Sequence, residues 1–386
     1  MSEPSGARAD PDTPARTAGS VLVVGSGLLG ASAGLALRAR GVDVALADPS
    51  PTAVALARDV GAGRVAGADE RPAVVLVAAP PDVTADVVAA QLLAHPSAVV
   101  TDVASVKGAV LQGVHRALGR AGAGPEVASR FVGGHPMAGR ERSGATSARA
   151  DLFTGRPWVL VPPPGASAAG EASLQRVLAL VADCRGVPVV MAAEQHDEAV
   201  AVVSHVPQVA ASLVAARLLG AADEAVALSG QGLRDVTRIA ASDPGLWVQI
   251  LGANARPVAR ALHALRADLD DVLGALDALA EDGEAVGARA RVARAIDTGG
   301  AGVARVPGKH GASPTAYEVV TVLVPDQPGR LARLLADVSD IGVNLEDLVL
   351  EHARGRPVGL AEVSVQPADR PRLEAELPRR GWRVAG

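Results

Sequence analysis

The chain contains glycines at a spacing that brings backbone close to a phosphate. In the stretch VLVVGSGLLGASAG, Gly25, Gly27 and Gly30 follow a β-branched run in a G-x-G-x-x-G pattern. The first glycine permits a tight turn, the second lets the backbone approach a pyrophosphate, and the third lets a helix pack closely on a strand. The N–H groups at the start of that helix, at Leu28 and Leu29, are expected to face the phosphates.

Asp48 bears on which dinucleotide binds at this turn. It ends the next β-branched run, where a carboxylate accepts hydrogen bonds from a ribose 2′-OH and repels a 2′-phosphate, and no arginine follows immediately. We therefore expect NAD rather than NADP, with Pro80, after the third run, beside the adenosine. The alternative is a glycine-rich turn that binds no cofactor.

His135 is the candidate for proton transfer. It lies in the segment GGHPMAG, which is expected at the carboxyl end of a later strand, where open α/β sheets bind ligands. An imidazole there can take a proton from a substrate hydroxyl as hydride leaves the same carbon. Ser105, in TDVASVK, is expected to hold that imidazole or the hydroxyl in line. The alternative is a structural histidine.

His205 lies in the most apolar stretch of the chain, residues 199–219. Pro207 removes a helical hydrogen bond close by, which predicts a kink or break that aims the histidine into a cleft. A core histidine at a helix joint is the alternative. Polar residues in mid-span, Gln208 among them, are costly in a bilayer, so we expect a buried or interface helix rather than a membrane span.

Further polar groups lie in the predicted helices. Arg234 and Arg238 are four residues apart and share a helical face, and for Arg234 a solvated ion-pair face is the simpler interpretation. His196 and Asp197 stand at the expected N-terminus of the long apolar helix. We interpret this pair as capping and surface residues.

Composition excludes several classes of protein. The 386 residues carry a formal net charge of -5, which argues against a general binder of nucleic acid or of anionic membranes. The single cysteine, Cys184, excludes an intramolecular disulfide and any multi-cysteine metal site, which fits a reducing cytoplasm; no metal is expected. Residues 1–19 have no continuous apolar segment of a secretory signal and are expected to be a disordered tail.

The sequence predicts three domains, and the candidate residues named above lie in the first two. Residues 20–192 alternate β-branched runs with helical stretches, which predicts a doubly wound α/β unit of Rossmann type. Residues 193–296 lack strand signals and predict an all-helical domain. A Gly/Pro-rich linker is expected at 297–316. Residues 317–386 predict a βαββαβ, ferredoxin-like domain.

Five segments together resemble a known family. GSGLLG, DVASVK, GGHPMAGRERSG, VVSHVPQ and GLRDVTRIAASDPGLWVQI, in this order, are similar to motifs of the prephenate/arogenate dehydrogenase family over residues 20–295. The resemblance implies oxidation of the C4 hydroxyl of prephenate with hydride passing to NAD. Loss of the ring carboxylate as CO2 then gives 4-hydroxyphenylpyruvate, a step of tyrosine biosynthesis. Arogenate is the alternative substrate.

The resemblance also implies roles for single residues. His135 resembles the family's catalytic histidine, and Ser105 the serine that bonds to it or to the substrate hydroxyl. His205 resembles a histidine of the substrate site, and Arg238 the arginine that binds a substrate carboxylate. The helical domain of the family forms a dimer, which implies a homodimer here.

Two departures from the family pattern leave the substrate open. The chain has Gln208 where the family usually has a second histidine, and Arg140 where a small hydroxyl residue is common. Arg140 favours the keto acid prephenate through its carboxylate, whereas Glu141 could bind the ammonium group of arogenate. Both residues are expected in the substrate site.

The C-terminal segment resembles an ACT domain, a module that binds small amino acids. Gly329, in VPDQPGRL, would expose backbone N–H groups to a carboxylate, and Asn344 would supply an amide. The resemblance implies L-tyrosine as an effector, with a purely structural role in dimerisation as the alternative. Two other functions remain open: a different two-domain NAD dehydrogenase, disfavoured because no lysine occurs between Lys107 and Lys309, and a non-catalytic amino-acid sensor.

Overall fold

The computed structural model describes residues 14–139, 144–163, 165, 167–306, 317–352 and 358–385. The described residues up to Ala264 form one compact unit, and those from Leu265 onward form a second. Each unit is described by itself.

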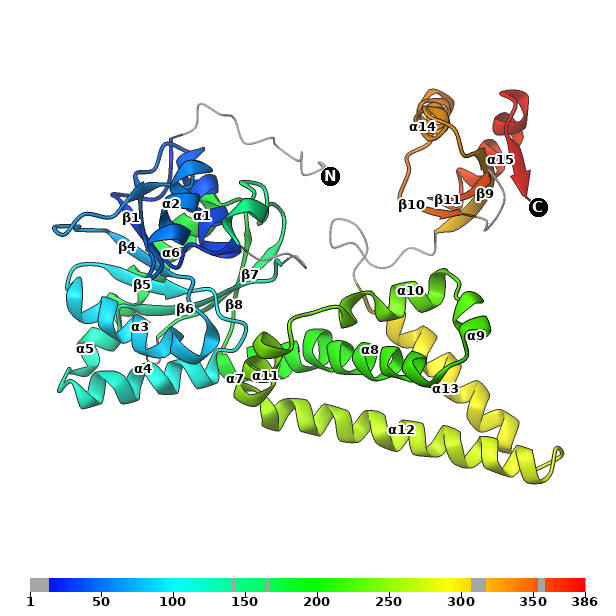
Figure 1. The fold of residues 1–386 in the computed structure, drawn as a ribbon, viewed down its shortest axis with the longest axis horizontal. Helices are drawn as coiled ribbons and strands as arrows, with labels where there is room; N and C mark the ends of the chain where they lie inside the picture. The colour runs from blue at the N-terminus through cyan, green and yellow to red at the C-terminus, as the bar shows by residue number, and fades with distance from the viewer. Residues whose placement is uncertain are drawn as a thin grey trace. The chain divides into compact units, whose positions relative to one another are not determined.

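The first unit contains an eight-stranded sheet (Figure 1) in the order β3-β2-β1-β4-β5-β6-β7-β8. Strands β3 to β6 run parallel, β7 runs antiparallel to β6, and β8 runs parallel to β7. The predicted doubly wound, Rossmann-like unit is thereby confirmed. The strands are β1 Val21–Val24, β2 Val44–Ala47, β3 Arg64–Val65, β4 Val74–Val77, β5 Val99–Asp102, β6 Phe131–Pro136, β7 Pro157–Val161 and β8 Val187–Val190.

Helices cover both faces of this sheet (Figure 1), so its strands are nearly continuous apolar runs. Successive residues of one strand enter different cores: Val21 and Val23 pack with α1, α2 and α6, while Leu22 packs with α3 and α4. This alternation follows from the two-residue period of a strand. The helices are α1 Leu28–Arg38, α2 Pro51–Asp59, α3 Pro81–Ala94, α4 Gly108–Arg120, α5 Pro125–Ala128 and α6 Ala168–Asp183.

The end of the expected disordered tail is ordered. Thr17 is buried, and both its N–H and its hydroxyl donate to Asp183 Oδ2 over 2.7 Å. Asp183 is itself 3% exposed at the end of α6, and a buried carboxylate needs such partners. The tail prediction is therefore wrong for residues 14–19, while residues 1–13 lie outside the described residues.

Helices make up the rest of the first unit, and the described residues from 193 to 306 contain no strand. Within the described part of the chain, the stretch Ala193–Gly220 is long and apolar enough to cross a membrane by length and composition alone. Its elements are α7 Ala193–Val200, a π-helical turn Ala201–His205, α8 Val206–Ala216 and a 3-10 turn Arg217–Gly220. Then come α9 Asp223–Ala227, α10 Gln231–Thr237, a 3-10 turn Arg238–Ala240, α11 Pro244–Ala253 and α12 Ala255–Glu281, which runs into the second unit.

The second unit continues with α13, Ala288–Val303, which includes residues expected in a linker. The linker prediction is wrong for residues 297–303. Glycine costs a helix only about 1 kcal/mol relative to alanine, and the hydrogen-bond ladder continues to the bond from Ala304 N–H to Gly300 O (3.1 Å). Residues 307–316 lie outside the described residues.

A four-stranded antiparallel sheet in the order β10-β11-β9-β12 follows. Alternate residues of β9, Val320 and Val322 among them, pack under both helices of the domain, on Leu334 and Leu373 for example. The order of elements agrees with the expected βαββαβ order. The elements are β9 Glu318–Pro325, α14 Arg330–Ile341, β10 Asp347–His352, β11 Val358–Val365, α15 Arg370–Arg379 and β12 Arg383–Ala385.

Candidate active site

The glycine turn between β1 and α1 leaves no room for side chains at two of its positions. A Cβ at Gly25 would lie 2.3 Å from the carbonyl oxygen of Ala78, and one at Gly30 would lie 1.9 Å from that of Gly25. Gly25 also has a φ of 107°, a region that favours glycine. A Cβ at Gly27 would meet nothing within 4 Å. The turn is therefore closed toward the sheet and open at Gly27, where α1 begins.

Asp48 lies beside this turn at the end of β2. Its carboxylate accepts the N–H of Ser26 over 2.7 Å and that of Ser50 over 2.9 Å. The hydroxyl of Ser26 is buried and has no hydrogen-bond partner among the described residues. A buried polar group without a partner calls for a ligand or a water, so the turn has the character of a binding site.

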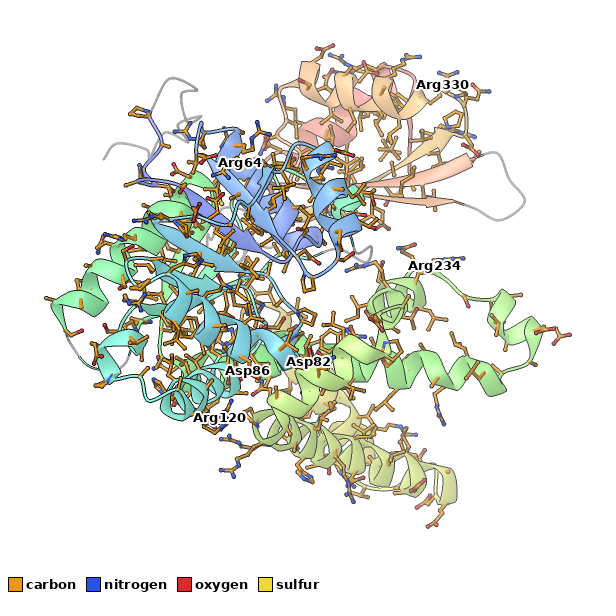
Figure 2. All side chains as sticks on the ribbon, turned by 60° about the vertical axis from the view of Figure 1, so that its left-hand side comes forward. Arg64, Asp82, Asp86, Arg120, Arg234 and Arg330 are labelled. Atoms are coloured by element: carbon orange, nitrogen blue, oxygen red, sulfur yellow. The ribbon has the colours of Figure 1, made fainter. Side chains whose placement is uncertain are left out.

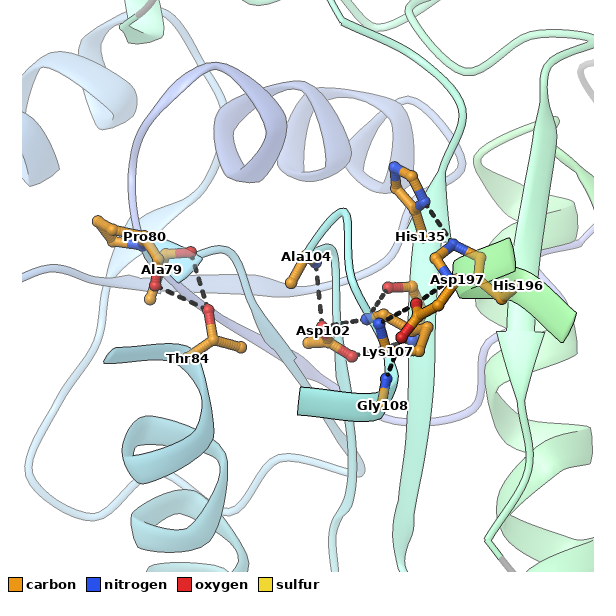
Figure 3. Close-up of polar contacts among 11 residues, drawn as sticks. Ala79, Pro80, Thr84, Asp102, Ala104, Lys107, Gly108, His135, His196 and Asp197 are labelled. Carbon is orange, nitrogen blue, oxygen red and sulfur yellow. Dashed lines mark hydrogen bonds and ion pairs between the residues drawn. The ribbon is translucent and has the colours of Figure 1, made fainter. Parts of the chain in front are cut away.

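Pro80 follows β4 and precedes α3. It is exposed, and its carbonyl oxygen accepts the hydroxyl of Thr84 over 2.8 Å (Figure 3). This contact fixes the start of α3. That Pro80 borders an adenosine stays a prediction.

His135 stands near the end of β6 in a line of three hydrogen-bonded side chains (Figure 3). Its Nδ1 lies 2.8 Å from Nε2 of His196, and Nδ1 of His196 lies 2.8 Å from Oδ1 of Asp197. The two imidazoles meet edge to face, with ring centroids 5.1 Å apart. All three side chains are buried. Strand β6 and helix α7, the first helix after the last strand of the sheet, thus meet at His135.

A buried ion pair between Lys107 and Asp102 holds the backbone next to His135. Lys107 Nζ donates to the carbonyl oxygen of Gly134 over 2.6 Å, and Asp102 Oδ1 accepts the N–H of the same glycine over 2.9 Å. Both polar groups of the residue before His135 are therefore satisfied by charged side chains. Burial lowers the pKa of Lys107, although Asp102 beside it acts in the opposite direction.

The surroundings keep the imidazole of His135 neutral. Burial lowers its pKa well below the usual range, and His196, Lys107 and His205 act in the same direction. A neutral imidazole at neutral pH can accept a proton.

Hydrogen bonds, in contrast, keep the carboxylate of Asp197 ionised. Burial raises its pKa, but hydrogen bonds from His196 and from the backbone N–H groups of Lys107 (2.8 Å) and Gly108 (2.9 Å) outweigh burial and lower it overall. These N–H groups open α4, where the helix dipole also favours an anion.

His205 ends the π-helical turn before α8 and is 1% exposed. The helix is not broken at Pro207: α7, the π-helical turn and α8 follow one another as one helix from Ala193 to Gly220, and the turn is the irregularity that lies beside the proline. Asn254 Nδ2 lies 3.1 Å from His205 Nδ1 and donates to the carbonyl oxygen of Asp197 over 2.8 Å. His205 is thus linked to the line of side chains that ends at His135.

Ser105 lies apart from this line of hydrogen bonds. No hydrogen bond joins it to His135 within the described residues, and Nδ1 of that ring lies against His196 instead. Ser105 is half-buried and lines a cavity of about 260 Å³ between α3, α4 and α11. Asp86 and Arg120 line the same cavity and form an ion pair of 3.1 Å (Figure 2).

Arg238 is exposed on the 3-10 turn that packs beside α8. Gln208, buried on α8, contacts Ser242 Oγ over 3.5 Å and Ser212 Oγ over 3.4 Å. Gln208 therefore ties the segment after Arg238 to the helix that begins directly after His205.

The remaining predicted residues cannot be joined to this site. Arg140 and Glu141 lie outside the described residues. Gly329 and Asn344 belong to the second unit, where Gly329 has a φ of 82° before α14 and Asn344 donates to Glu346 over 2.8 Å. Among the described residues, no group of His, Cys, Asp and Glu side chains is arranged to hold a metal ion.

The interpretation of His196 and Asp197 as surface residues is wrong. They are 1% and 8% exposed, and each contacts the site. The buried residues of α7 are Ala193, His196, Asp197 and Val200, a spacing of three, four and seven residues that marks the buried face of a helix. That periodicity was the signal that could have found them.

Comparison with known proteins gives the same picture along the chain. Residues 33–190 match the family described as "Prephenate dehydrogenase, nucleotide-binding domain", and residues 192–285 match "Prephenate dehydrogenase, dimerization domain". The chain is 40% identical over 366 residues to "Probable prephenate dehydrogenase NovF" of Streptomyces niveus, a match over 94% of this chain and 98% of that protein. It is 26% identical to the prephenate dehydrogenase of Bacillus subtilis, over 91% of this chain and 93% of that one.

A solved structure supports this at the level of the fold. The prephenate dehydrogenase from A. aeolicus, in complex with hydroxyphenyl propionate and NAD+, superposes with a TM-score of 0.62 at 27% identity, over 74% of this chain and 98% of that chain. The Rossmann-like unit, the helical domain after it and the full-length similarity to the Streptomyces protein agree. This chain belongs to the prephenate dehydrogenase family, a family of NAD-dependent oxidoreductases.

Proposed function

We propose that the chain oxidises prephenate to 4-hydroxyphenylpyruvate with NAD and releases CO2. The observation that carries this proposal is the neutral, buried His135, which has one ring nitrogen hydrogen-bonded to His196 and the other left for a substrate. The family membership and the names of the relatives support the same reaction.

The glycine turn and Asp48 are the proposed cofactor site. When bound, NAD supplies an acceptor for hydride. The opening at Gly27 and the first N–H groups of α1, at Leu28 and Leu29, would bind its pyrophosphate. Asp48 would accept a ribose hydroxyl, and Pro80 would border the adenosine. The partnerless hydroxyl of Ser26 agrees with a ligand at this turn.

His135 is the proposed base. Its free nitrogen, Nε2, would take the proton from the C4 hydroxyl while hydride leaves the same carbon. The C–CO2 bond breaks and its electron pair enters the ring, which becomes aromatic. Because aromatisation makes the step favourable, a neutral imidazole is a sufficient base. Ser105, at its cavity, would orient the hydroxyl.

Four further residues are proposed to contact the substrate. The planar guanidinium of Arg238 is suited to a bidentate contact with a carboxylate. His205 would donate a hydrogen bond, as argued below. Arg140 and Glu141 are proposed to read the side chain that distinguishes prephenate from arogenate.

The substrate and the cofactor are tested by initial rates of reduced-nicotinamide formation, with prephenate and arogenate each paired with NAD and NADP. We expect the fastest turnover with prephenate and NAD. Turnover with arogenate alone would overturn the substrate, and no turnover with any pair would overturn the reaction and favour an amino-acid sensor. A relative from Zymomonas mobilis, 30% identical over 68% of this chain and 90% of that protein, is named "Cyclohexadienyl dehydrogenase", so relatives carry more than one named activity.

The helical domain is the proposed surface of a homodimer. The match to a dimerization domain supports it, as do large apolar side chains left exposed there: Val202 at 63%, Val203 at 65% and Leu213 at 61%. Light scattering on the purified protein should give twice the mass of one chain. We propose that these side chains are buried at the interface of a homodimer in a reducing cytoplasm. The apolar helix would then belong to a dimer interface and not span a membrane.

For residues 317–386, the C-terminal part of the second unit, we propose a ferredoxin-like ACT domain that binds L-tyrosine. The strand order of its sheet and the positive φ of Gly329 at the turn into α14 support this, with Asn344 nearby in the sequence. Saturating tyrosine should lower the rate and raise the melting temperature. If neither changes, a structural role in dimerisation replaces the sensor.

A further inference from the structure

We propose that His196 and Asp197 are positioning residues that set opposite tautomers on the two site histidines. They leave His135 with a basic Nε2 and, through Asn254, leave His205 with a donating Nε2–H. This inference rests on the proposed function and deepens it, since it assigns to each histidine the role that the reaction needs.

The argument begins at Asp197, whose carboxylate can only accept hydrogen bonds. Oδ1 lies 2.8 Å from Nδ1 of His196, so the proton of His196 lies on Nδ1. The N–H groups of Lys107 and Gly108 hold the same carboxylate at the start of α4. The carboxylate is thereby fixed in position as well as in charge.

The tautomer of His135 follows from that of His196. With its proton on Nδ1, the neutral form of His196 has a lone pair on Nε2 and accepts there. Nδ1 of His135, 2.8 Å away, must be the donor. The lone pair of His135 therefore lies on Nε2. When that nitrogen takes a proton, the imidazolium keeps its bond to His196, and the fixed carboxylate behind it stabilises the new charge.

The tautomer of His205 is inferred in the same way, from its contact with Asn254. The carbonyl oxygen of Asp197 accepts from the side chain of Asn254 over 2.8 Å, so the NH2 end of this amide faces it. The second hydrogen of that NH2 group points to Nδ1 of His205, 3.1 Å away. Nδ1 of His205 is therefore an acceptor and its proton lies on Nε2. An oxygen of the substrate is the partner that such a donor would bind.

A structural role for the pair does not require a histidine at position 196. Asp197 alone caps α4, and an apolar side chain of similar size would fill the buried space of His196. Burying an imidazole instead requires partners for both of its nitrogens, which His135 and Asp197 supply. Lys107 and His205 also face His135, but Nζ of Lys107 is bound to Gly134 and Asp102. His196 is the group bonded to the ring.

The kinetic test compares His196→Gln with His196→Leu. The amide oxygen of glutamine can accept from Nδ1 of His135 in the place of Nε2, whereas leucine fills the space without accepting. We expect kcat of His196→Leu to fall on the order of 10- to 100-fold, with the KM for substrate and the Kd for NAD nearly unchanged. His196→Gln should recover most of kcat. His115→Leu, at an exposed histidine of α4, is the matched control and should behave as the wild type.

A measurement on the wild type keeps the inference testable if His196→Leu does not fold. Long-range 1H–15N spectra of protein labelled at histidine report which ring nitrogen carries the proton, with each signal assigned by its single variant. His135 should carry its proton on Nδ1 and His205 on Nε2. The opposite tautomer at His135, normal turnover of His196→Leu, or equal loss in His196→Leu and His196→Gln would overturn the inference. Expected tautomers in a protein without turnover would overturn the proposed function alone.

Discussion

Lys107 reaches Gly134 with its ammonium group and thereby holds the strand at the residue before His135. Its counter-ion Asp102 holds the other polar group of that glycine. The two charges are fully buried and depend on each other, because a buried charge without its partner is costly. The ion pair thus couples the stability of the sheet to the position of the proposed base.

Lys107→Met is expected to destabilise the protein by about 3–5 kcal/mol, since it leaves Asp102 charged and buried without its partner. Urea unfolding followed by circular dichroism measures the loss. Adding Asp102→Asn should recover part of it by removing the unpaired charge. If the single variant unfolds like the wild type, the pair does not support the fold as described.

His135→Asn is expected to cut turnover by about a hundredfold or more, the usual scale of acid–base assistance, and to leave NAD binding intact. Stopped-assay rates and the quenching of protein fluorescence by NAD measure the two quantities separately. In the wild type, burial lowers the pKa of His135 in the ligand-free protein, so we expect the acidic limb of kcat/KM below about pH 6.5. A variant with near-normal turnover would remove His135 from the mechanism.

Stability should fall in mildly acidic solution. Burial lowers the pKa of both His135 and His205, whereas in the unfolded chain each titrates near about 6.5. Below that pH the unfolded chain binds protons that the folded protein does not, so the free energy of unfolding drops by about 1 kcal/mol per pH unit for each group. Above about pH 7 the contribution of both groups is complete and constant.

Urea titrations at several pH values between neutral and mildly acidic measure this slope. His135→Asn should show a shallower slope than the wild type, because one of the two imidazoles with a lowered pKa is gone. His263→Asn, at an exposed histidine of α12, is the control and should keep the wild-type slope. Equal slopes for His135→Asn and the wild type would contradict the lowered pKa.

Asp48→Asn is expected to reduce kcat/KM with NAD by about 10- to 100-fold, the effect of losing a hydrogen bond to a charged group. The relative preference for NADP should rise, because the charge that repels a 2′-phosphate is gone. Asp48 also accepts the N–H groups of Ser26 and Ser50, so the substitution could change the stability of the protein. The melting temperatures of variant and wild type are compared to separate this effect from the loss of NAD binding. Unchanged preference would place the selection of the cofactor elsewhere.

Local patterns predicted the first unit well. The glycine spacing and the β-branched runs depend on neighbours in the sequence, and both lie where expected, from Gly25 to the strands of the sheet. The direction of β7 could not be predicted in this way, because parallel and antiparallel strands share the same two-residue period. Its antiparallel pairing depends on partners distant in the sequence.

The polar line behind His135 was missed for a related reason. His196 is far from His135 in the sequence, and only the fold brings their rings into contact. Charged and polar types at the start of a helix are usually caps, so residue type pointed to the surface while the helical period of α7 pointed inward. The period was the better guide, because burial follows from packing and not from residue type alone.

The contacts of Asp197 limit where this protein could be joined to part of a relative in a chimaera. The two family matches meet at residues 190 and 192, which suggests a junction for exchanging one module against that of a relative. The bonds from Asp197 to the start of α4 and from His196 to His135 mean that α7 works with the first module although it is encoded with the second. A chimaera joined there keeps the contacts of α7 with α4 and His135 only if both parents have the same residues at these positions. A junction placed after the π-helical turn takes α7 and the sheet from the same parent.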